Sequence, residues 1–385
     1  MLQGFISNYS NFYCPNFKEL RFSYQQYIDS LKALVPKLFE IKKVGESFLG
    51  KDIFQIKFGT GNCKILMWSQ MHGNEPISTQ GLIDFLYFLN NSSSEIKNKI
   101  SQKFTIYAIP LLNPDGAELF QRRNAQEIDL NRDAKKLSAP ESQLLWQIAQ
   151  NLKPNFAFNL HDQERYYGNA LSNTPTAISL LTPSFDFQKT VDDKRLASMQ
   201  LVCTIFNDLN KLLPNNIAKY NDAFMPTAFG DCIEGLGIST ILLEAGYIIG
   251  DENRQLVRKY YFASILSAIL SLIDNKHLSY NIDDYNSIPT NIKLNFVDLL
   301  IKNIKFKKNG KIFATDIAII RNVLDTEKFT DLCKEYIIWD IGDLNHQKAF
   351  QIIDAQEVTI NNNIKRLDNA DSLLQILTKY KNNEI

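Results

Sequence analysis

Apolar positions follow two different periods between residues 40 and 273. Short continuous apolar runs, such as residues 65–68 and 104–109, are typical of strands buried on both faces. Between these runs, apolar residues recur at the spacing of one helix face, as in residues 77–89 and 192–213. Strands that alternate with helices predict an α/β fold, a mixed and mainly parallel sheet covered by helices on both faces.

The predicted elements can be placed by their bounding turn and capping residues. Helices are expected at residues 24–35, 77–89, 144–152, 192–213 and 254–273, and strands at residues 39–44, 52–58, 64–69, 104–109, 155–159 and 240–243. The Ser-Ala-Pro-Glu segment at residues 138–141 has the capping-box pattern of a helix start.

The pattern changes after residue 277. Residues 304–307 and 311–314 flank the turn sequence Lys308-Asn309-Gly310 and predict a hairpin, and residues 336–341 and 358–360 predict further short strands. Two domains are therefore expected, a catalytic domain over residues 1–277 and a small β-rich accessory domain over residues 278–385.

Composition limits the kinds of partner that are expected. The 42 basic and 42 acidic residues balance, so neither nucleic acid nor an anionic membrane is an expected partner. The five cysteines have no Cys-x-x-Cys spacing, which favours buried thiols in a reducing compartment over a disulfide scaffold. With no signal peptide or membrane-spanning run recognised, a cytoplasmic protein is expected. The oligomeric state is left open.

Candidate chemistry lies where predicted strands end. His72 and Glu75 occupy a strand-to-helix loop, and His161 and Glu244 follow two other predicted strands. The carboxyl ends of parallel strands meet at one edge of a sheet, so these residues can converge on one crevice. Two imidazoles and a carboxylate with one open position favour zinc, although other divalent ions fit the same ligands.

Several short motifs now carry a resemblance. His-x-x-Glu at residues 72–75 precedes a lone His161. Asn-Pro-Asp-Gly at 113–116, Arg122-Arg123-Asn124 and Asp-Leu-Asn-Arg at 129–132 follow in the intervening chain, and Glu244 closes a strand in Ile-Leu-Leu-Glu-Ala-Gly. Residues 40–273 thereby resemble the zinc carboxypeptidase superfamily, of the carboxypeptidase A and B type.

The resemblance implies a role for each motif residue. His72, Glu75 and His161 would bind one zinc ion per chain, and Glu244 would act as general base. Asn131 and Arg132 would hold the carboxylate of a peptide or peptide-like substrate.

Two further roles concern side chains around the metal. Arg122 would stabilise the oxyanion, a role for which the Arg-x-Asn spacing favours it over Arg123. Asp129 is a candidate acceptor that orients His72.

The family's mobile tyrosine has no clear counterpart here. Asn221 to Pro226 occupy its place, and Tyr220, Tyr166, Tyr167 and Tyr247 are the nearby candidates. His-Gly-Asn-Glu also resembles the aspartoacylase and succinylglutamate desuccinylase branch, so a zinc N-acyl-amino-acid amidohydrolase is the first alternative. An inactive binding protein that retains the metal is the second.

Overall fold

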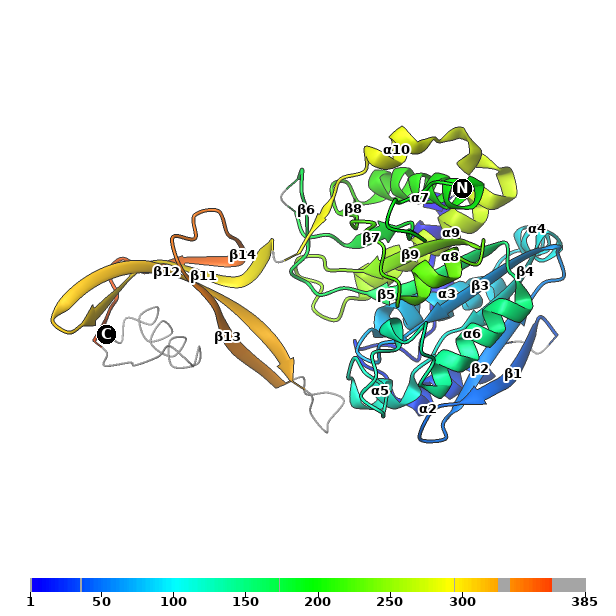
Figure 1. Ribbon diagram of the computed structural model, residues 1–385, viewed down its shortest axis with the longest axis horizontal. Helices are drawn as coiled ribbons and strands as arrows, with labels where there is room; N and C mark the ends of the chain where they lie inside the picture. The colour runs from blue at the N-terminus through cyan, green and yellow to red at the C-terminus, as the bar shows by residue number, and fades with distance from the viewer. Residues whose placement is uncertain (1, 35–36, 173, 294, 325–332, 362–385) are drawn as a thin grey trace. The chain divides into compact units, whose positions relative to one another are not determined.

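The computed structural model describes residues 2–34, 37–172, 174–293, 295–324 and 333–361. Its contacts divide the chain into two compact units, Met1–Ile292 and Lys293–Ile385, and Figure 1 shows the elements of each.

An eight-stranded sheet forms the centre of the first unit. Its order is β1-β2-β4-β3-β5-β9-β7-β8, and the four central strands β4, β3, β5 and β9 run parallel. The strands of this sheet are β1 (Phe39–Glu46), β2 (Asp52–Phe58), β3 (Cys63–Ser69), β4 (Phe104–Ile109), β5 (Phe156–Asp162), β7 (Ile178–Leu181), β8 (Ile217–Lys219) and β9 (Ser239–Ala245). A short ladder joins β6 (Gly168–Asn169) to β10 (Asn291–Ile292).

Helices cover both faces of this sheet. Apolar residues of α3, α4, α7 and α9 pack on one face and those of α6 and α8 on the other. The helices are α1 (Leu2–Ser7), α2 (Tyr24–Lys32), α3 (Pro76–Asn91), α4 (Ser94–Lys103), α5 (Pro114–Leu119), α6 (Pro140–Leu152), α7 (Asp193–Leu212), α8 (Phe229–Glu234), α9 (Gln255–Asp274) and α10 (Ile282–Asn286). The predicted α/β fold is confirmed.

Within the described residues, α9 alone is long and apolar enough to span a membrane by length and composition. In its most apolar window 72% of the residues are buried inside the unit. It therefore packs as a core helix of the first unit.

A buried ion pair fastens the N-terminal segment to this core. Arg258 on α9 donates to both oxygens of Asp84 on α3, and the same carboxylate accepts hydrogen bonds from the Tyr9 hydroxyl and the Cys14 backbone. The Arg258 guanidinium also donates to the carbonyls of Cys14 and Phe17. Residues 9–17 are thus tied to two core helices.

Several boundaries differ from the predicted ones. The strands predicted at 155–159 and 240–243 continue to Asp162 and Ala245, because β5 and β9 keep their parallel pairing that far. His161 and Glu244 therefore lie within strands and not after them, which corrects the expectation. The helix predicted at 24–35 ends at Lys32, and Val35 lies outside the described residues.

The second unit is β-rich, as predicted. Its sheet has the order β13-β12-β11-β14, with β15 paired to β11. The strands are β11 (Phe296–Lys308), β12 (Lys311–Leu324), β13 (Cys333–Gly342), β14 (Lys348–Asp354) and β15 (Thr359–Asn361). The hairpin at Lys308-Asn309-Gly310 is present, and its two strands are longer than the sequence indicates.

The division between the units differs from the predicted one at residue 277. Tyr285 on α10 is 2% exposed, and its hydroxyl accepts a hydrogen bond from the Thr182 backbone in the first unit. Asn291 pairs with Asn169, also in the first unit. The segment between 278 and 292 therefore completes the α/β unit.

Candidate metal centre

A tight loop after β3 carries the first two metal-ligand candidates. Gly73 lies so close to the backbone of Gly116 that a Cβ would come within 1.9 Å of the Gly116 carbonyl carbon, so the loop requires glycine there. Glu75 then immediately precedes Pro76, the first residue of α3. Proline suits a helix start because its missing N–H would have no helical partner.

The three predicted ligands converge. His72 Nδ1 lies 2.7 Å from Glu75 Oε1, and His161 Nδ1 lies 2.8 Å from Glu75 Oε2. All three side chains are buried, and their candidate ligand atoms lie within 4.8 Å of one another. Zinc bonds of about 2.0–2.2 Å place the ligand atoms of one ion about 3–4 Å apart. The donor set therefore fits one small divalent cation.

Partners from the segment 129–131 orient the two rings. The second ring nitrogen of His72, Nε2, donates to Asp129 Oδ1 at 3.0 Å, which leaves Nδ1 directed at Glu75. Asp129 is held in turn by the Asn131 backbone N–H and by Arg122 Nε. Asn131 Nδ2 lies 3.4 Å from His161 Nε2. Carboxylates and amides in such positions fix ring orientation and strengthen metal binding.

The electrostatics of the cluster suit a cation. Burial opposes ionisation of Glu75, but the rings of His72 and His161 outweigh it and hold the pKa of this carboxyl well below its usual range. Burial lowers the pKa of His161 and keeps it neutral, the form that binds metals. Burial disfavours a charged His72 as well, but Glu75 and Asp129 outweigh that effect and raise its pKa. The same negative field attracts a divalent ion.

Glu244 lies beside this cluster. It pairs with His161 across β5 and β9 and with Ser179 across β7 and β9. Its Oε2 atom is buried and has no hydrogen-bond partner among the residues that the structure describes. Burial, followed by the charges of Glu75 and Asp162, raises the pKa of the Glu244 carboxyl well above its usual value. A carboxylate with these properties is a strong proton acceptor.

The two neighbouring arginines take different directions. Arg122 donates to Glu75 Oε1 at 3.3 Å, and its guanidinium lies 3.2 Å from His72 Nδ1. Arg123 instead donates to the Glu127 carbonyl. Arg122 is therefore the arginine of the two that reaches the metal-ligand candidates.

Asn131 and Arg132 are both anchored through backbone groups. Asn131 Oδ1 accepts from the Phe229 N–H at the start of α8, and Arg132 donates to the Asn131 carbonyl. Arg132 is exposed and lines a surface cavity of about 570 Å³ together with Asp129, Asp133 and Lys136. Its guanidinium thus remains accessible to an anionic ligand.

Sequence reasoning missed the residues that hold this site together. Asp162, one residue after His161, accepts from the Ile77 and Ser78 N–H groups and so fixes the start of α3. Arg254 donates to the same carboxylate at 3.3 Å and to the Gly246 carbonyl at 2.9 Å. The only signal in the sequence was that Asp162 adjoins His161.

One of the candidate tyrosines lies in this region. The Tyr220 hydroxyl donates to Gln163 Oε1 at 2.6 Å, and the Tyr167 ring lies 5.4 Å from the Tyr220 ring. Burial and the nearby charge of Glu244 raise the pKa of Tyr220 well above its usual value. Tyr247 instead donates to Glu252.

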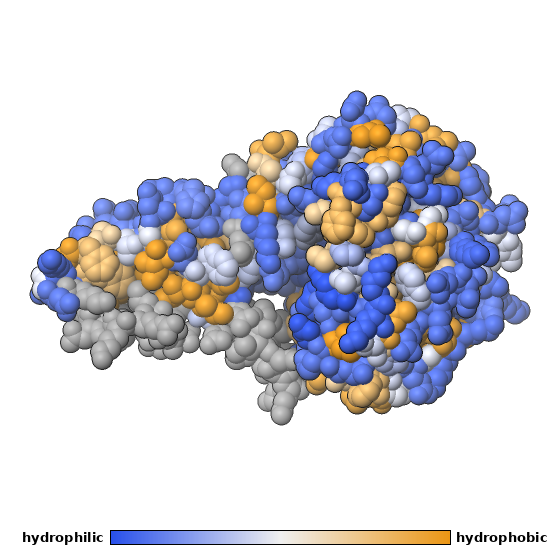
Figure 2. Space-filling model, viewed as in Figure 1, coloured by the Kyte–Doolittle hydropathy of each residue, from blue (hydrophilic) through white to orange (hydrophobic). Residues whose placement is uncertain are grey.

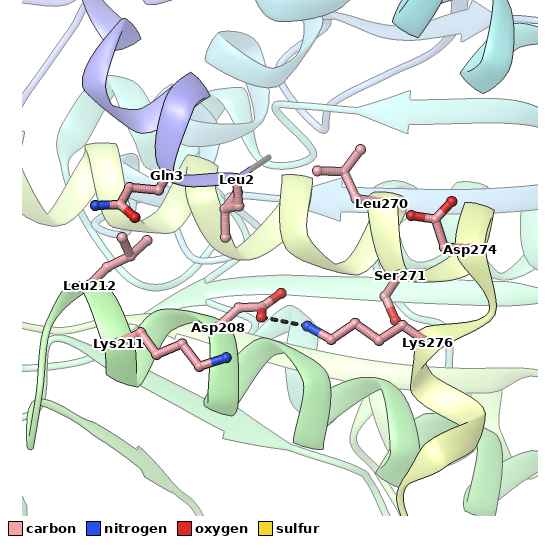
Figure 3. Close-up of a pocket in the computed structure, with 9 residues that line it drawn as sticks. All are labelled: Leu2, Gln3, Asp208, Lys211, Leu212, Leu270, Ser271, Asp274 and Lys276. Carbon is pink, nitrogen blue, oxygen red and sulfur yellow. Dashed lines mark hydrogen bonds and ion pairs between the residues drawn. The ribbon is translucent and has the colours of Figure 1, made fainter.

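A second cavity contains none of these residues. It has a volume of about 260 Å³ and lies between α1, α7 and α9, where Asp208 and Lys276 form an ion pair of 2.6 Å (Figure 3). On the face of the molecule in Figure 2, hydrophilic residues predominate over the first unit and apolar patches are small.

Solved structures define the class of fold. A metallo-carboxypeptidase from Burkholderia cenocepacia matches with a TM-score of 0.52 at 19% identity, over 66% of this chain and 70% of that one. A metallo-carboxypeptidase from Pseudomonas aeruginosa, in complex with (2-guanidinoethylmercapto)succinic acid, matches with a TM-score of 0.51 at 14% identity, over 67% of this chain and 70% of that one. The first unit thus has the α/β fold of the metallocarboxypeptidases.

Sequence comparison also gives a matching family model. Residues 24–197 match the model of the zinc carboxypeptidase family, so the predicted resemblance is confirmed. This range includes the three metal-ligand candidates, whereas Glu244 lies beyond it.

Individual relatives match over shorter stretches. Carboxypeptidase 2 of Trichophyton rubrum is 32% identical over 101 residues, which is 26% of this chain and 19% of the relative. Carboxypeptidase E of Caenorhabditis elegans is 29% identical over 120 residues, 26% of this chain and 25% of the relative. The chain thus spans only about a fifth to a quarter of these relatives.

Proposed function

We propose that this protein is a zinc-dependent metallocarboxypeptidase that hydrolyses an amide or peptide bond next to a free carboxylate. The observation that carries the proposal is the buried and unpartnered carboxylate oxygen of Glu244 beside the His-Glu-His cluster. A buried carboxylate oxygen without a partner costs stability, and such a cost is expected at a site selected for reaction.

His72, Glu75 and His161 would hold one zinc ion, which when bound supplies a Lewis acid that polarises a carbonyl and lowers the pKa of water. Glu244 accepts the proton of the attacking water and delivers it to the leaving amine. Arg122 directs its positive charge to the oxygen on which negative charge develops. Asp129 keeps the His72 ring in its ligating orientation.

Substrate positioning is assigned to Asn131 and Arg132, which the start of α8 contacts through the Phe229 N–H. Arg132 offers an exposed guanidinium, whose planar fork matches a carboxylate. The backbone carbonyl of Asn131 accepts from Arg132, and its side-chain oxygen accepts from the Phe229 N–H. Asn131 therefore keeps these two donors close together. A substrate that ends in a carboxylate would therefore present its last peptide bond to Glu244.

Two alternatives are weighed against this proposal. A zinc N-acyl-amino-acid amidohydrolase uses the same ligand set, but the relatives and the family that match this chain are carboxypeptidases. An inactive binding protein has no need of a general base such as Glu244. Only the His-Gly-Asn-Glu sequence at residues 72–75 favours the first alternative.

The first experiment is elemental analysis of the purified protein beside His161→Ala. We expect about one zinc per chain, lost in the variant because two ligands hold the ion much less tightly than three. If neither protein holds a divalent metal, even after zinc is supplied, the result would contradict the proposed zinc enzyme and favour the binding-protein alternative.

The second experiment compares substrates and a base variant. Peptides with a free C-terminus should be hydrolysed, whereas the same peptides with an amidated C-terminus and simple N-acyl amino acids should not. Glu244→Gln should lower kcat by several powers of ten and leave the zinc content unchanged. Glu127→Gln, an exposed neighbour of the site, is the matched control. Normal turnover by Glu244→Gln would exclude Glu244 as the base.

A further inference from the structure

Three hydrogen-bond donors converge on one side-chain oxygen beside the proposed base. This oxygen is Oε1 of Gln163, a residue that is 6% exposed. It accepts from the Ser179 hydroxyl at 2.9 Å, the Tyr220 hydroxyl at 2.6 Å and the Asn291 amide at 2.7 Å. The donors come from β7, from the residue after β8 and from β10. Because an amide oxygen has two lone pairs, three donors saturate it.

The other end of the Gln163 amide fixes its orientation. Nε2 donates at 3.2 Å to the Thr176 carbonyl, a group that can only accept. A Cβ at Gly246 would come 2.6 Å from this Nε2 and 1.9 Å from the Thr176 carbonyl oxygen, so the contact requires glycine there. The Gln163 backbone N–H donates to the Ala245 carbonyl. The amide is thus held with Oε1 facing the three donors.

Glu244 lies next to the first of these donors. Ser179 is its direct partner across β7 and β9, and their paired neighbours Leu180 and Leu243 belong to the apolar core on the other face of the sheet. Directly opposed residues of an antiparallel pair have Cβ atoms about 4.5–5.5 Å apart on one face. The Ser179 hydroxyl rotates about one bond, so both Glu244 and Gln163 compete for it. It donates to Gln163.

The Tyr220 hydroxyl is the second donor near the proposed base. Burial and then the charge of Glu244 raise the pKa of Tyr220, so this hydroxyl is within electrostatic reach of the carboxylate. A hydrogen bond from either hydroxyl would occupy a lone pair on which Glu244 has to accept the proton of water. Glu244 Oε2 nevertheless has no hydrogen-bond partner among the residues that the structure describes. Both hydroxyls are directed at Gln163 instead.

Resting on the proposed function, we infer that Gln163 is a positioning residue that draws the donors of Ser179 and Tyr220 away from Glu244. The carboxylate thereby keeps an open lone pair for the water that attacks the substrate. A buried carboxylate oxygen without a partner costs stability, although two hydroxyls able to supply one lie nearby. The packing around Gln163 preserves this unfavourable state, which is useful only to a proton acceptor.

The test is Gln163→Met, which keeps the length of the side chain and removes the acceptor. Ser179 and Tyr220 can then donate to Glu244. For a peptide with a free C-terminus, kcat should fall roughly tenfold or more, as expected for one hydrogen bond to a charged group. KM should stay within about threefold of the wild type, because the residues that bind the substrate are unchanged. The zinc content should also be unchanged.

Removing a released donor should restore turnover, which a merely structural role of Gln163 does not predict. Gln163→Met is therefore combined with Ser179→Ala and, separately, with Tyr220→Phe. At least one double variant should have a kcat about threefold or more above that of Gln163→Met alone. If Gln163→Met does not fold, Gln163→Asn takes its place, because the shorter side chain withdraws the acceptor from the same donors.

Gln80→Met is the matched control for loss of a buried amide. Gln80 is fully buried on α3, and its Nε2 donates to the carbonyls of Glu19 and Leu20. Its kcat per folded protein should stay within about threefold of the wild type.

Two outcomes overturn the assignment of Gln163 in an active wild type. One is a Gln163→Met kcat within about threefold of the wild type, and the other is a pair of double variants no faster than Gln163→Met. Failure of the wild type to hydrolyse any peptide contradicts the proposed function itself.

Discussion

Each metal-ligand candidate depends on groups from elsewhere in the sequence. His72 is oriented by Asp129, and Glu75 accepts the Asp162 backbone N–H while it contacts both rings. The His-x-x-Glu motif places two ligands next to each other, but these partners keep their donor atoms in one direction. Substitutions of residues around the ligands should therefore change turnover and metal affinity to different extents.

Arg122 should contribute to turnover more than to metal binding. Its guanidinium contacts Glu75 and lies near His72, and 43% of its side chain is exposed. The guanidinium can therefore approach the substrate oxygen on which negative charge develops. We expect Arg122→Ala to lower kcat by about 10²–10³-fold, the usual cost of losing one oxyanion donor. Steady-state kinetics with a free C-terminal peptide measures this loss.

Arg123→Ala is the matched control for that substitution, because Arg123 bonds only to the Glu127 carbonyl in the described contacts. Its kcat should stay within a factor of about three of the wild type, as expected for a surface residue without a role in the transition state. Equal losses in both variants would contradict the assignment of Arg122.

Helix α8 contacts the proposed substrate residue Asn131 at its start and strand β9 at its end. Its first residue, Phe229, donates its N–H to Asn131 Oδ1, and Gly230 lies next to the Asn159 amide. Its last residue is Glu234, whose Oε2 accepts from the Thr240 N–H of β9. The six residues of α8 are too few to be stable alone. These tertiary contacts hold α8 in place.

The end of α8 should make stability depend on pH. Burial raises the pKa of Glu234 from 4.5 to about 8, so the folded protein keeps a proton that the unfolded chain releases. The contribution of the protonated group is present below pH 4.5 and is lost as the pH rises to about 8.

Glu234→Gln should therefore flatten the fall of Tm between pH 5 and pH 9 and raise Tm at pH 9 by about 2 °C or more. Glutamine keeps an oxygen for the Thr240 N–H. Thermal unfolding followed by circular dichroism tests this, with the exposed Glu19→Gln as the control. Parallel Tm curves for wild type and Glu234→Gln would show that Glu234 does not titrate in this range.

The pair of Asp84 and Arg258 connects α3, α9 and the N-terminal segment. Arg258→Met would leave the Asp84 carboxylate buried without its counter-charge, which should lower the free energy of unfolding by about 3–5 kcal/mol. Asp84→Asn combined with Arg258→Met should cost less than Arg258→Met alone, because no charge then remains buried. Urea unfolding of the variants measures both effects. A double variant less stable than Arg258→Met would contradict this account.

The extent of the α/β unit can be tested with two shortened chains. A chain ending at residue 292 keeps Tyr285 on α10 and the pairing of β10 with β6. A chain ending at residue 277, the division that the sequence suggests, loses both.

We expect the chain 1–292 to unfold cooperatively with its proposed activity retained. The chain 1–277 should unfold at least about 5 °C lower, because it exposes the cavity left by Tyr285. Circular dichroism and peptide hydrolysis provide the readouts. Equal stability of the two chains would favour the division at residue 277.

The sequence by itself determined the elements with strong periodicity and the order of the site residues. The apolar runs of β3 and β4 and the helical stripes of α3 and α7 are local properties, since each depends on its own side-chain spacing. The order of the motifs can also be read directly from the sequence. It predicted a metal site formed by His72, Glu75 and His161. Short or weakly patterned elements, such as α4 and β7, did not stand out.

Only the tertiary structure decided which groups are satisfied and which are not. Arg122 reaches the cluster while Arg123 turns away, although the two are adjacent in sequence. The unpartnered Asn159 amide and the Asp162 contact with α3 depend on strand pairing between segments far apart in the chain. Burial and hydrogen bonding are properties of the packed molecule, because they require knowing which distant residues lie within a few ångströms.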